Sequence, residues 1–453
     1  MFKESIYINR RKKLINIMSD GLILFLGNNE SPINYPANAY PFRQDSTFSY
    51  YIGLDEPNLA TIIDIDEKKV ILFGNELTVE DIVWMGPQPS LKDKANSAGI
   101  DDYLPINKLE EYIKNTLRKK RKIHFLPPYR ADKALWLESL LGIKANIIKE
   151  YSSVELIKAV VDMRSVKQKE EIKEIESALQ LTAILYNEAY KMAKAEVKES
   201  EIAGRLEGIA LEAGTHLSFP PIVTVHGEIL HNTPSNTVLK KGNMLLVDIG
   251  VESAMHYSSD ITRTFPVDKK FTSLQKEAYQ TVIDMQQAAI NAIKPGKSFL
   301  EVHLIAAKKM VENFKSIGFF KNNTDDILSS GAYAIIFPHG LGHMLGLDVH
   351  DMEDLGEDYV GYDDTVRRSN LFGLAYLRFA KKLQPGFVVT IEPGIYFIPE
   401  LIEQWEQQQK HKDFIKYSKV KLFKNFGGIR IEDDVLVTDD SYKILSENIK
   451  FKF

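Results

Sequence analysis

Residues 244–266, MLLVDIGVESAMHYSSDITRTFP, predict a hairpin of two buried strands with a carboxylate near the turn end of each. The apolar run that begins at Met244 leads to Asp248, and a carboxylate there is costly to bury unless it is paired or bound to a metal. Asp260 opens DITRTFP, which is typical of the return strand. Such a hairpin would bring the two carboxylates face to face. Two aspartates that only cap turns would explain this stretch alone equally well.

A second segment, PHGLGHMLGLDVHD (residues 338–351), contains three histidines, His339, His343 and His350. Its glycines allow close approach of the backbone and unusual backbone angles. A single core histidine is usually only a hydrogen-bonded residue. Three of them in a glycine-rich segment that also contains two aspartates indicate a functional site.

Two later segments each add a glutamate. Glu392 comes at the end of the apolar run FVVTI and precedes Pro393-Gly394, a pair that ends or bends a strand. In GGIRIEDD, Arg430 and Glu432 alternate on a predicted strand and therefore share a face. Arg430 would then orient the metal-binding carboxylates by hydrogen bonds without contacting the metal itself. The alternative is a surface ion pair on an edge strand.

Together these segments supply a hard, oxygen-rich ligand set of four carboxylates and one imidazole. Such a set suits a pair of divalent cations better than one structural zinc. Two such cations can activate water at neutral pH and polarise a carbonyl group. The sequence therefore predicts a metallohydrolase with the ligands Asp248, Asp260, His343, Glu392 and Glu432.

The composition excludes several other classes. The chain has 453 residues, of which 57 are basic and 62 acidic. This near balance argues against nucleic-acid binding and against a polybasic membrane anchor. The absence of cysteine excludes disulfides, thiolate catalysis and a Cys-ligated zinc. The N-terminus lacks the apolar core of a signal peptide, and no stretch approaches the length of a membrane span, so we expect a cytoplasmic enzyme.

The length predicts two domains, which we place at residues 1–158 and 159–453. The first alternates short apolar runs such as GLILFLG and KVILFG with helical patterns at 107–119 and 131–141, which predicts an α/β domain. Its proline- and aromatic-rich stretch from Asn34 to Pro57 is predicted to be an ordered loop and strand.

The second domain begins with amphipathic helices that extend to Ala213, where Gly214 is placed as a C-terminal cap. Two further helices are predicted near 273–293 and 298–314. The chain after Phe337 is predicted to be mostly strands. Helices around a curved antiparallel sheet would form an α+β arrangement.

The motifs HGLGH, GLDVHD, TIEPGIYF and GIRIEDD, with YPFRQDSTFSYYIGLDEP near the N-terminus, resemble the proline-specific metallopeptidases of family M24B, aminopeptidase P and prolidase. The resemblance covers essentially the whole chain. It implies a two-domain α+β fold, with a creatinase-like, ribonuclease-H-like α/β domain followed by a catalytic pita-bread domain. It also implies hydrolysis of an N-terminal Xaa-Pro bond, whose proline lacks an N–H and fits general aminopeptidases poorly.

The resemblance further implies roles for the metal ligands. Asp248 would bind one ion, and Asp260 and Glu432 would bridge both. His343 and Glu392 would complete the ligand set, and Glu392 would also accept the proton of the attacking water. The implied cofactor is two divalent ions, for which Mn²⁺ is favoured and Co²⁺ or Zn²⁺ would also fit.

Four other residues match catalytic or supporting positions of the family. His231 and His350 match histidines that contact substrate and stabilise the tetrahedral intermediate, and His339 and Arg430 match residues that support the metals. The segment before His231 lacks the family's asparagine-bearing glycine turn, which leaves His226 as a competitor. The hairpin between Asp248 and Asp260 is one residue longer than in the family, and we expect its loop to absorb the difference.

The substrate's length is left open between two members of the family. The N-terminal domain favours aminopeptidase P, which releases the first residue of longer peptides, whereas the long charged segment from Pro399 to Asn425 resembles prolidase, which acts on the dipeptide. A non-catalytic peptide-binding homologue and a metal-free creatine hydrolase are less compatible with the complete ligand set. The expected partners are peptides with proline at the second position, and the expected assembly is a homodimer or homotetramer.

Overall fold

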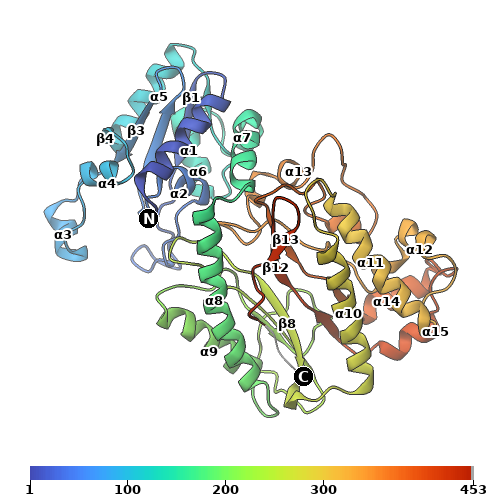
Figure 1. Cartoon of the computed structure of the whole chain (residues 1–453). Coiled ribbons are helices and arrows are strands. Elements are labelled where there is room, and N and C mark those ends of the chain that lie inside the picture. The colour runs from blue at the N-terminus through green and yellow to red at the C-terminus, as the bar shows by residue number, and fades with distance from the viewer. Residues whose placement is uncertain (450–453) are drawn as a thin grey trace. The chain divides into compact units, whose positions relative to one another are not determined.

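A computed structural model describes residues 1–449 (Figure 1). Contacts divide the chain into two compact units. The N-terminal unit contains Met1–Arg164 and Asp354–Tyr359, and the C-terminal unit contains Ser165–Glu353 and the chain from Val360 onward. The boundary that we placed at residues 158 and 159 lies inside helix α7 (Val154–Ser165), and it stays a prediction.

The N-terminal unit is built on a mixed five-stranded sheet with the order β4-β3-β2-β1-β5. Neighbours β1–β2 and β2–β3 are antiparallel, and β1–β5 and β3–β4 are parallel. Apolar side chains of the strands and of the helices α5 and α6 form one buried core, as the alternating pattern predicts. The strands are β1 (Leu22–Leu26), β2 (Ala60–Asp64), β3 (Lys69–Gly74), β4 (Asp102–Pro105) and β5 (Ile123–His124). The helices besides α7 are α1 (Glu4–Ile17), α2 (Ser46–Ile52), α3 (Val79–Met85), α4 (Leu91–Ser97), α5 (Leu109–Arg118) and α6 (Ala131–Leu141).

Helix α2 corrects the prediction of a loop and strand between Asn34 and Pro57. The Asp45 side chain caps the helix by accepting a hydrogen bond of 2.8 Å from the Phe48 N–H. Gly53 ends it with a φ of 78°, a conformation that glycine adopts without strain. The aromatic residues between the two caps conceal the helix because they are more typical of strands.

The C-terminal unit has an α+β architecture in which every strand pair is antiparallel. Its strands form three small sheets with the orders β6-β7-β8, β13-β12-β9 and β10-β11. The long helices α8 and α9 pack together, as do α10 and α11 (Figure 1). Helix α10 also lies against β9, β10 and β11. The strands are β6 (Ile222–Thr224), β7 (Met244–Ile249), β8 (Ile261–Pro266), β9 (Val388–Ile391), β10 (Gly394–Tyr396), β11 (Gly428–Arg430), β12 (Asp433–Val437) and β13 (Tyr442–Ile444). The long helices are α8 (Lys169–Met192), α9 (Glu199–Glu212), α10 (Ser273–Asn291) and α11 (Phe299–Ser316).

The β7–β8 hairpin keeps its two aspartates on one face. Asp248 pairs directly with Thr262, and the same register continues past the strands to the bridge between Glu252 and Ser258. Because side chains alternate along a strand, Asp260 shares the face of Thr262 and therefore of Asp248. The register is continuous from the strands to this bridge, and the extra residue relative to the family stays a prediction.

The prediction of mostly strands after Phe337 is wrong for a long stretch. The described chain between Phe337 and Phe387 contains short helical turns and loops and no strand. The histidine segment instead lies against β9, where the Thr390 N–H donates to the His343 carbonyl. A Cβ on Gly342 would lie 2.0 Å from the Thr390 carbonyl oxygen, so glycine permits this contact. Between Pro399 and Asn425 the chain forms helices α14 (Pro399–Gln407) and α15 (Tyr417–Val420).

None of the helices within residues 1–449 combines the length and the apolar character that a membrane crossing requires.

Helix α11 contains a fully buried histidine, His303, which should make stability depend on pH. Its Nε2 lies 3.0 Å from the Tyr333 hydroxyl, its ring stacks on Phe337, and burial lowers its pKa to about 3. An unfolded histidine has a pKa near 6.5, so the unfolded chain gains the proton first as the pH falls. The stability contributed by neutral His303 is therefore complete above pH 6.5 and falls by up to about 1.4 kcal/mol per pH unit below it.

His303→Phe should lose less stability than the parent protein between pH 7 and 5.5, by about 1 kcal/mol in urea unfolding of the C-terminal unit. The exposed His216→Gln variant removes an ionisable imidazole without this burial and serves as the control. Parallel pH profiles for the parent protein and His303→Phe would contradict the assignment.

Candidate metal centre and active site

One cavity of about 1340 Å³ in the C-terminal unit is lined by the predicted metal ligands and the predicted catalytic residues. The residues come from strand ends and loops that are far apart in the chain. Apolar side chains such as Phe219, Leu230 and Phe372 form much of the surrounding wall. The nine predicted site residues in the wall are His231, Asp248, Asp260, His339, His343, His350, Glu392, Arg430 and Glu432.

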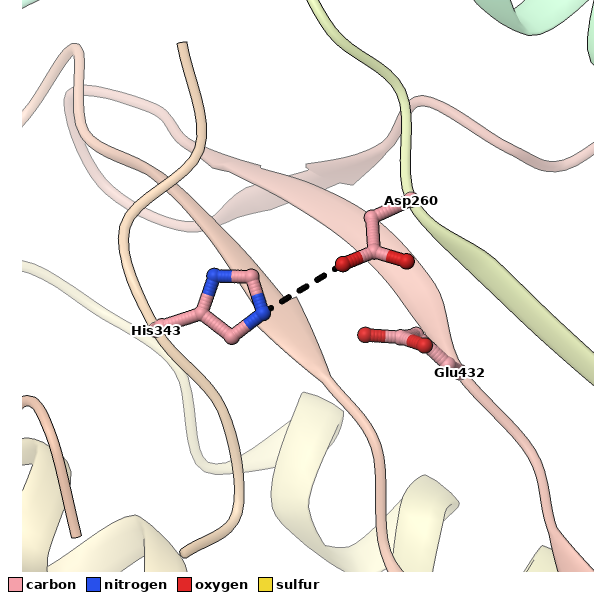
Figure 2. Close-up of side chains that lie close together, drawn as sticks. All are labelled: Asp260, His343 and Glu432. Atoms are coloured by element: carbon pink, nitrogen blue, oxygen red, sulfur yellow. Dashed lines mark ion pairs between the residues drawn. The ribbon is translucent and has the colours of Figure 1, made fainter. Parts of the chain in front are cut away.

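Asp260, His343 and Glu432 form a compact buried group that could hold a metal ion (Figure 2). One ligand atom of each lies within 4.8 Å of the others, and His343 Nε2 is 3.4 Å from Asp260 Oδ2. Asp260 precedes β8, and Glu432 lies between β11 and β12. Glu432 is joined to the hairpin because its N–H donates to the Thr262 carbonyl and its Oε2 accepts from the Thr262 hydroxyl.

Hydrogen bonding leaves His343 with its Nε2 lone pair directed toward the acidic group. Its Nδ1 lies 3.0 Å from the Met344 carbonyl oxygen, which can only accept, so Nδ1 bears the proton. Nε2 is then the unprotonated nitrogen that a metal needs. Burial lowers the pKa of His343, which favours the same neutral ring.

Asp248 and Glu392 extend the group on either side. Glu392 follows β9, and its Oε1 is 3.8 Å from His343 Nε2. Asp248 Oδ2 accepts a hydrogen bond of 2.6 Å from Arg430. Asp248 Oδ1 and Glu432 Oε1 are buried and have no hydrogen-bond partner among the described residues. Buried carboxylate oxygens without donors are costly, and a bound cation would satisfy them.

The electrostatics of the acidic residues also fit a cation. Burial, and next the charge of Asp248, raise the pKa of Asp260 well above its usual value. Burial, and next the charge of Asp260, do the same to the pKa of Glu432. Burial also raises the pKa of Glu392. Positive charge between these groups would offset the repulsion that raises their pKa values.

Arg430 joins the acidic group to His339 through Tyr396. Arg430 Nη1 donates to the Tyr396 hydroxyl at 3.0 Å, and Nε donates to Thr262 Oγ1 at 3.1 Å. The Tyr396 hydroxyl lies 2.9 Å from His339 Nε2, while His339 Nδ1 lies 2.7 Å from the Gly340 carbonyl oxygen. Nδ1 therefore bears the proton, and the tyrosine donates to Nε2. Burial lowers the pKa of His339 to about 3.

The sequence analysis missed both Tyr396 and Thr262. Thr262 was accessible in principle, because it lies two residues after Asp260 on the same strand and so shares its face. Tyr396 lies in the motif EPGIYF, but nothing in the spacing indicates that its hydroxyl reaches Arg430 and His339.

A second network holds His350. Its Nδ1 lies 2.6 Å from Glu353 Oε2, and Arg378 Nη1 donates to the other oxygen of Glu353 at 2.7 Å. Burial, and next His343, lower the pKa of His350 to about 4. Arg378 also lines the cavity. Glu353 and Arg378 were not predicted, although Glu353 lies only three residues after His350.

His231 lines the cavity on a loop between β6 and β7. Burial lowers its pKa, as does the next largest influence, the charge of Arg430. Its competitor His226 lies outside the set of described residues that line the cavity, and its Nδ1 is 3.1 Å from Glu228. This geometry favours His231 over His226.

Arg263 connects the segments of the predicted metal ligands to Ile449, the last described residue. It is buried on β8 and donates to the Glu432 carbonyl, to Asp433 at 2.7 Å and to the Ile449 carbonyl at 2.7 Å. The position of Glu432 is therefore coupled to that of the last described residue.

Comparisons with known proteins identify the family of the chain. Residues 173–439 match the model of metallopeptidase family M24, and residues 7–125 match the aminopeptidase P N-terminal domain. The chain is 29% identical to human Xaa-Pro dipeptidase, with 96% of this chain and 88% of that protein covered. It is 33% identical to a probable Xaa-Pro aminopeptidase of Fusarium vanettenii, with 90% and 85% covered.

The structure is similar to Escherichia coli aminopeptidase P with the inhibitor Pro-Leu. The TM-score is 0.81 at 25% identity, and the comparison covers 100% of this chain and 96% of that one. With the family model spanning most of the C-terminal unit and this likeness extending over the whole chain, the protein belongs to metallopeptidase family M24 and has an N-terminal domain of the aminopeptidase P type.

Proposed function

We propose that the protein is a dinuclear-metal peptidase that cleaves the N-terminal Xaa-Pro bond of peptides, as an aminopeptidase P. The observation that supports it most is the buried group of Asp260, His343 and Glu432, with unsatisfied carboxylate oxygens beside it in a large cavity. The relatives support the substrate class, because they are named Xaa-Pro dipeptidase and Xaa-Pro aminopeptidase. The E. coli structures contain a substrate or Pro-Leu.

In this proposal five residues hold two divalent ions. The ligands would be Asp248, Asp260, His343, Glu392 and Glu432. Their hard oxygen donors with one imidazole suit Mn²⁺, which we propose as the native metal. When bound, such a pair supplies Lewis acidity toward a carbonyl and lowers the pKa of water.

The chain's own groups would move protons and orient the peptide. Glu392, whose pKa is raised by burial, would accept a proton from the attacking water. His231 and, in its protonated form, His350 would donate hydrogen bonds toward the oxygen of the scissile carbonyl, where negative charge develops. Glu353 orients His350 by accepting a hydrogen bond from its Nδ1, so Nε2 can donate only when the ring is an imidazolium.

Prolidase activity on dipeptides is the second candidate, favoured by Arg378. This arginine places positive charge on the cavity wall. A dipeptide has its own terminal carboxylate close to the scissile bond, and arginine binds carboxylates strongly. The volume of the cavity favours the longer substrate.

The purified protein supplied with Mn²⁺ should cleave Ala-Pro-Ala, and a chelator should abolish the activity. Product analysis of Ala-Pro and Ala-Pro-Ala side by side distinguishes the two candidates, because cleavage of the dipeptide alone would identify prolidase. An Ala-Ala-Ala peptide is the control for proline specificity. No cleavage of either proline peptide with metal supplied would refute the proposed function.

Asp260→Asn or Glu432→Gln should lose bound metal and at least 100-fold in turnover while the protein stays folded. In the absence of metal each variant should be at least as stable as the parent, because it removes one of several repelling buried carboxylates. Metal content by mass spectrometry and thermal unfolding in chelator measure the two effects. The exposed Asp440→Asn is the matched control, and a fully active, metal-loaded variant at either ligand would contradict the assignment.

A further inference from the structure

The loop of residues 225–235 places His231 in the wall of the cavity. The imidazole is positioned by the loop's backbone and not by hydrogen bonds of its own ring. The loop has no helix or strand and connects β6 to β7. Among residues 1–449 no hydrogen bond is present at the His231 ring. The direction in which the ring points therefore depends on how the loop is anchored.

Glu199, the first residue of α9, anchors both ends of this loop with one carboxylate. The side chain is fully buried. Its Oε1 accepts a hydrogen bond of 2.8 Å from the Val225 N–H. Its Oε2 accepts from the Ser235 hydroxyl at 2.8 Å and from the Ser235 N–H at 3.2 Å. These three hydrogen bonds to one buried carboxylate, which we call the Glu199 clamp, fix the separation of the loop's ends.

Backbone hydrogen bonds hold the start of α9, where Glu199 lies, against the chain that follows the loop. The Glu199 N–H donates to the Thr237 carbonyl at 3.1 Å, and the Ser200 N–H donates to the Ser235 carbonyl at 2.9 Å. The start of α9 is thereby bonded to the chain that leaves the loop. The same helix lines the cavity with Ser200 and Ala203, so it is already part of the site's wall.

Two contacts inside the loop complete the support. Asn232, next to His231, donates to Thr224 Oγ1 at 2.8 Å. Gly227 packs so closely on β11 that a Cβ there would lie 2.5 Å from the Gly428 carbonyl oxygen. The loop therefore packs against β11, the strand that contains Arg430, and the hydrogen bonds of Glu199 stabilise this position.

We propose that Glu199 is a positioning residue, which fixes His231 in the orientation required to stabilise the reacting carbonyl. This inference rests on the proposed function for its catalytic consequence, but the clamp itself is a property of the fold. A helix-start carboxylate also interacts favourably with the helix dipole. That effect alone would involve neither the loop nor His231.

The test is Glu199→Gln, which keeps the size of the side chain and one acceptor oxygen. Its NH₂ group would face the Ser235 donors, so one end of the loop should loosen. We expect kcat to fall between roughly 10- and 100-fold, as a misplacement of about 1 Å does, with the unfolding midpoint of the C-terminal unit little changed. Hydrogen exchange by mass spectrometry should accelerate across residues 225–235. Glu201 is an exposed carboxylate in the same first turn, so Glu201→Gln is the matched control. It should change neither kcat nor the hydrogen exchange of the loop.

A double variant separates positioning from general destabilisation. If Glu199 acts through His231, Glu199→Gln should cost almost nothing further in kcat in a His231→Ala background. Full additivity of the two losses, or unchanged hydrogen exchange in the loop, would overturn the proposal. Should Glu199→Gln fail to fold, Ser235→Ala removes one of the three hydrogen bonds and should give a smaller change of the same kind. If the parent protein cleaves no Xaa-Pro peptide, the proposed function fails, and the exchange measurement still decides whether the clamp exists.

Discussion

Repulsion among buried carboxylates is the constraint on which the C-terminal unit is built. Asp248, Asp260, Glu392 and Glu432 enclose one space, and burial together with their mutual charge raises the pKa of three of them. Such a cluster is unfavourable in a metal-free protein unless other groups compensate. Arg430 offsets part of the repulsion, and a cation bound to the unsatisfied oxygens of Asp248 and Glu432 would offset more.

The pKa values of the neighbouring histidines are shifted in the direction opposite to those of the carboxylates. Burial lowers the pKa values of His231, His339, His343 and His350, so the rings are neutral where the carboxylates are most crowded. Neutral rings can act as ligands through one nitrogen or as donors through the other. The assignment of each role follows from its hydrogen bonds, since carbonyl groups fix the protonated nitrogen of His339 and His343.

Sequence patterns predicted elements whose signals are local. Helix α6 was predicted with its observed bounds, because its apolar spacing ends at Gly142. Helix α2 was not, because its aromatic composition favoured a strand and only the cap at Asp45 indicated a helix. The nine predicted site residues line one cavity; five were chosen for the chemistry of metal ligands, and four for the match to the family's motifs. Glu353 was missed although it lies only three residues after its partner His350. Tyr396, Arg378 and Glu199 were missed because each reaches the site through hydrogen bonds between segments that are distant in the sequence. Spacing alone contains no record of such contacts.

The bonds of Arg263 to the carbonyls of Glu432 and Ile449 have a consequence for the chain as it emerges from the ribosome. Asp248 is synthesised long before Glu432, and the Ile449 carbonyl that Arg263 binds follows both. Contacts of such wide sequence separation form late, because loop closure must precede any gain from them. The acidic residues therefore come together only after Glu432 has been synthesised. The group that could hold a metal ion is then one of the later features of this unit to form.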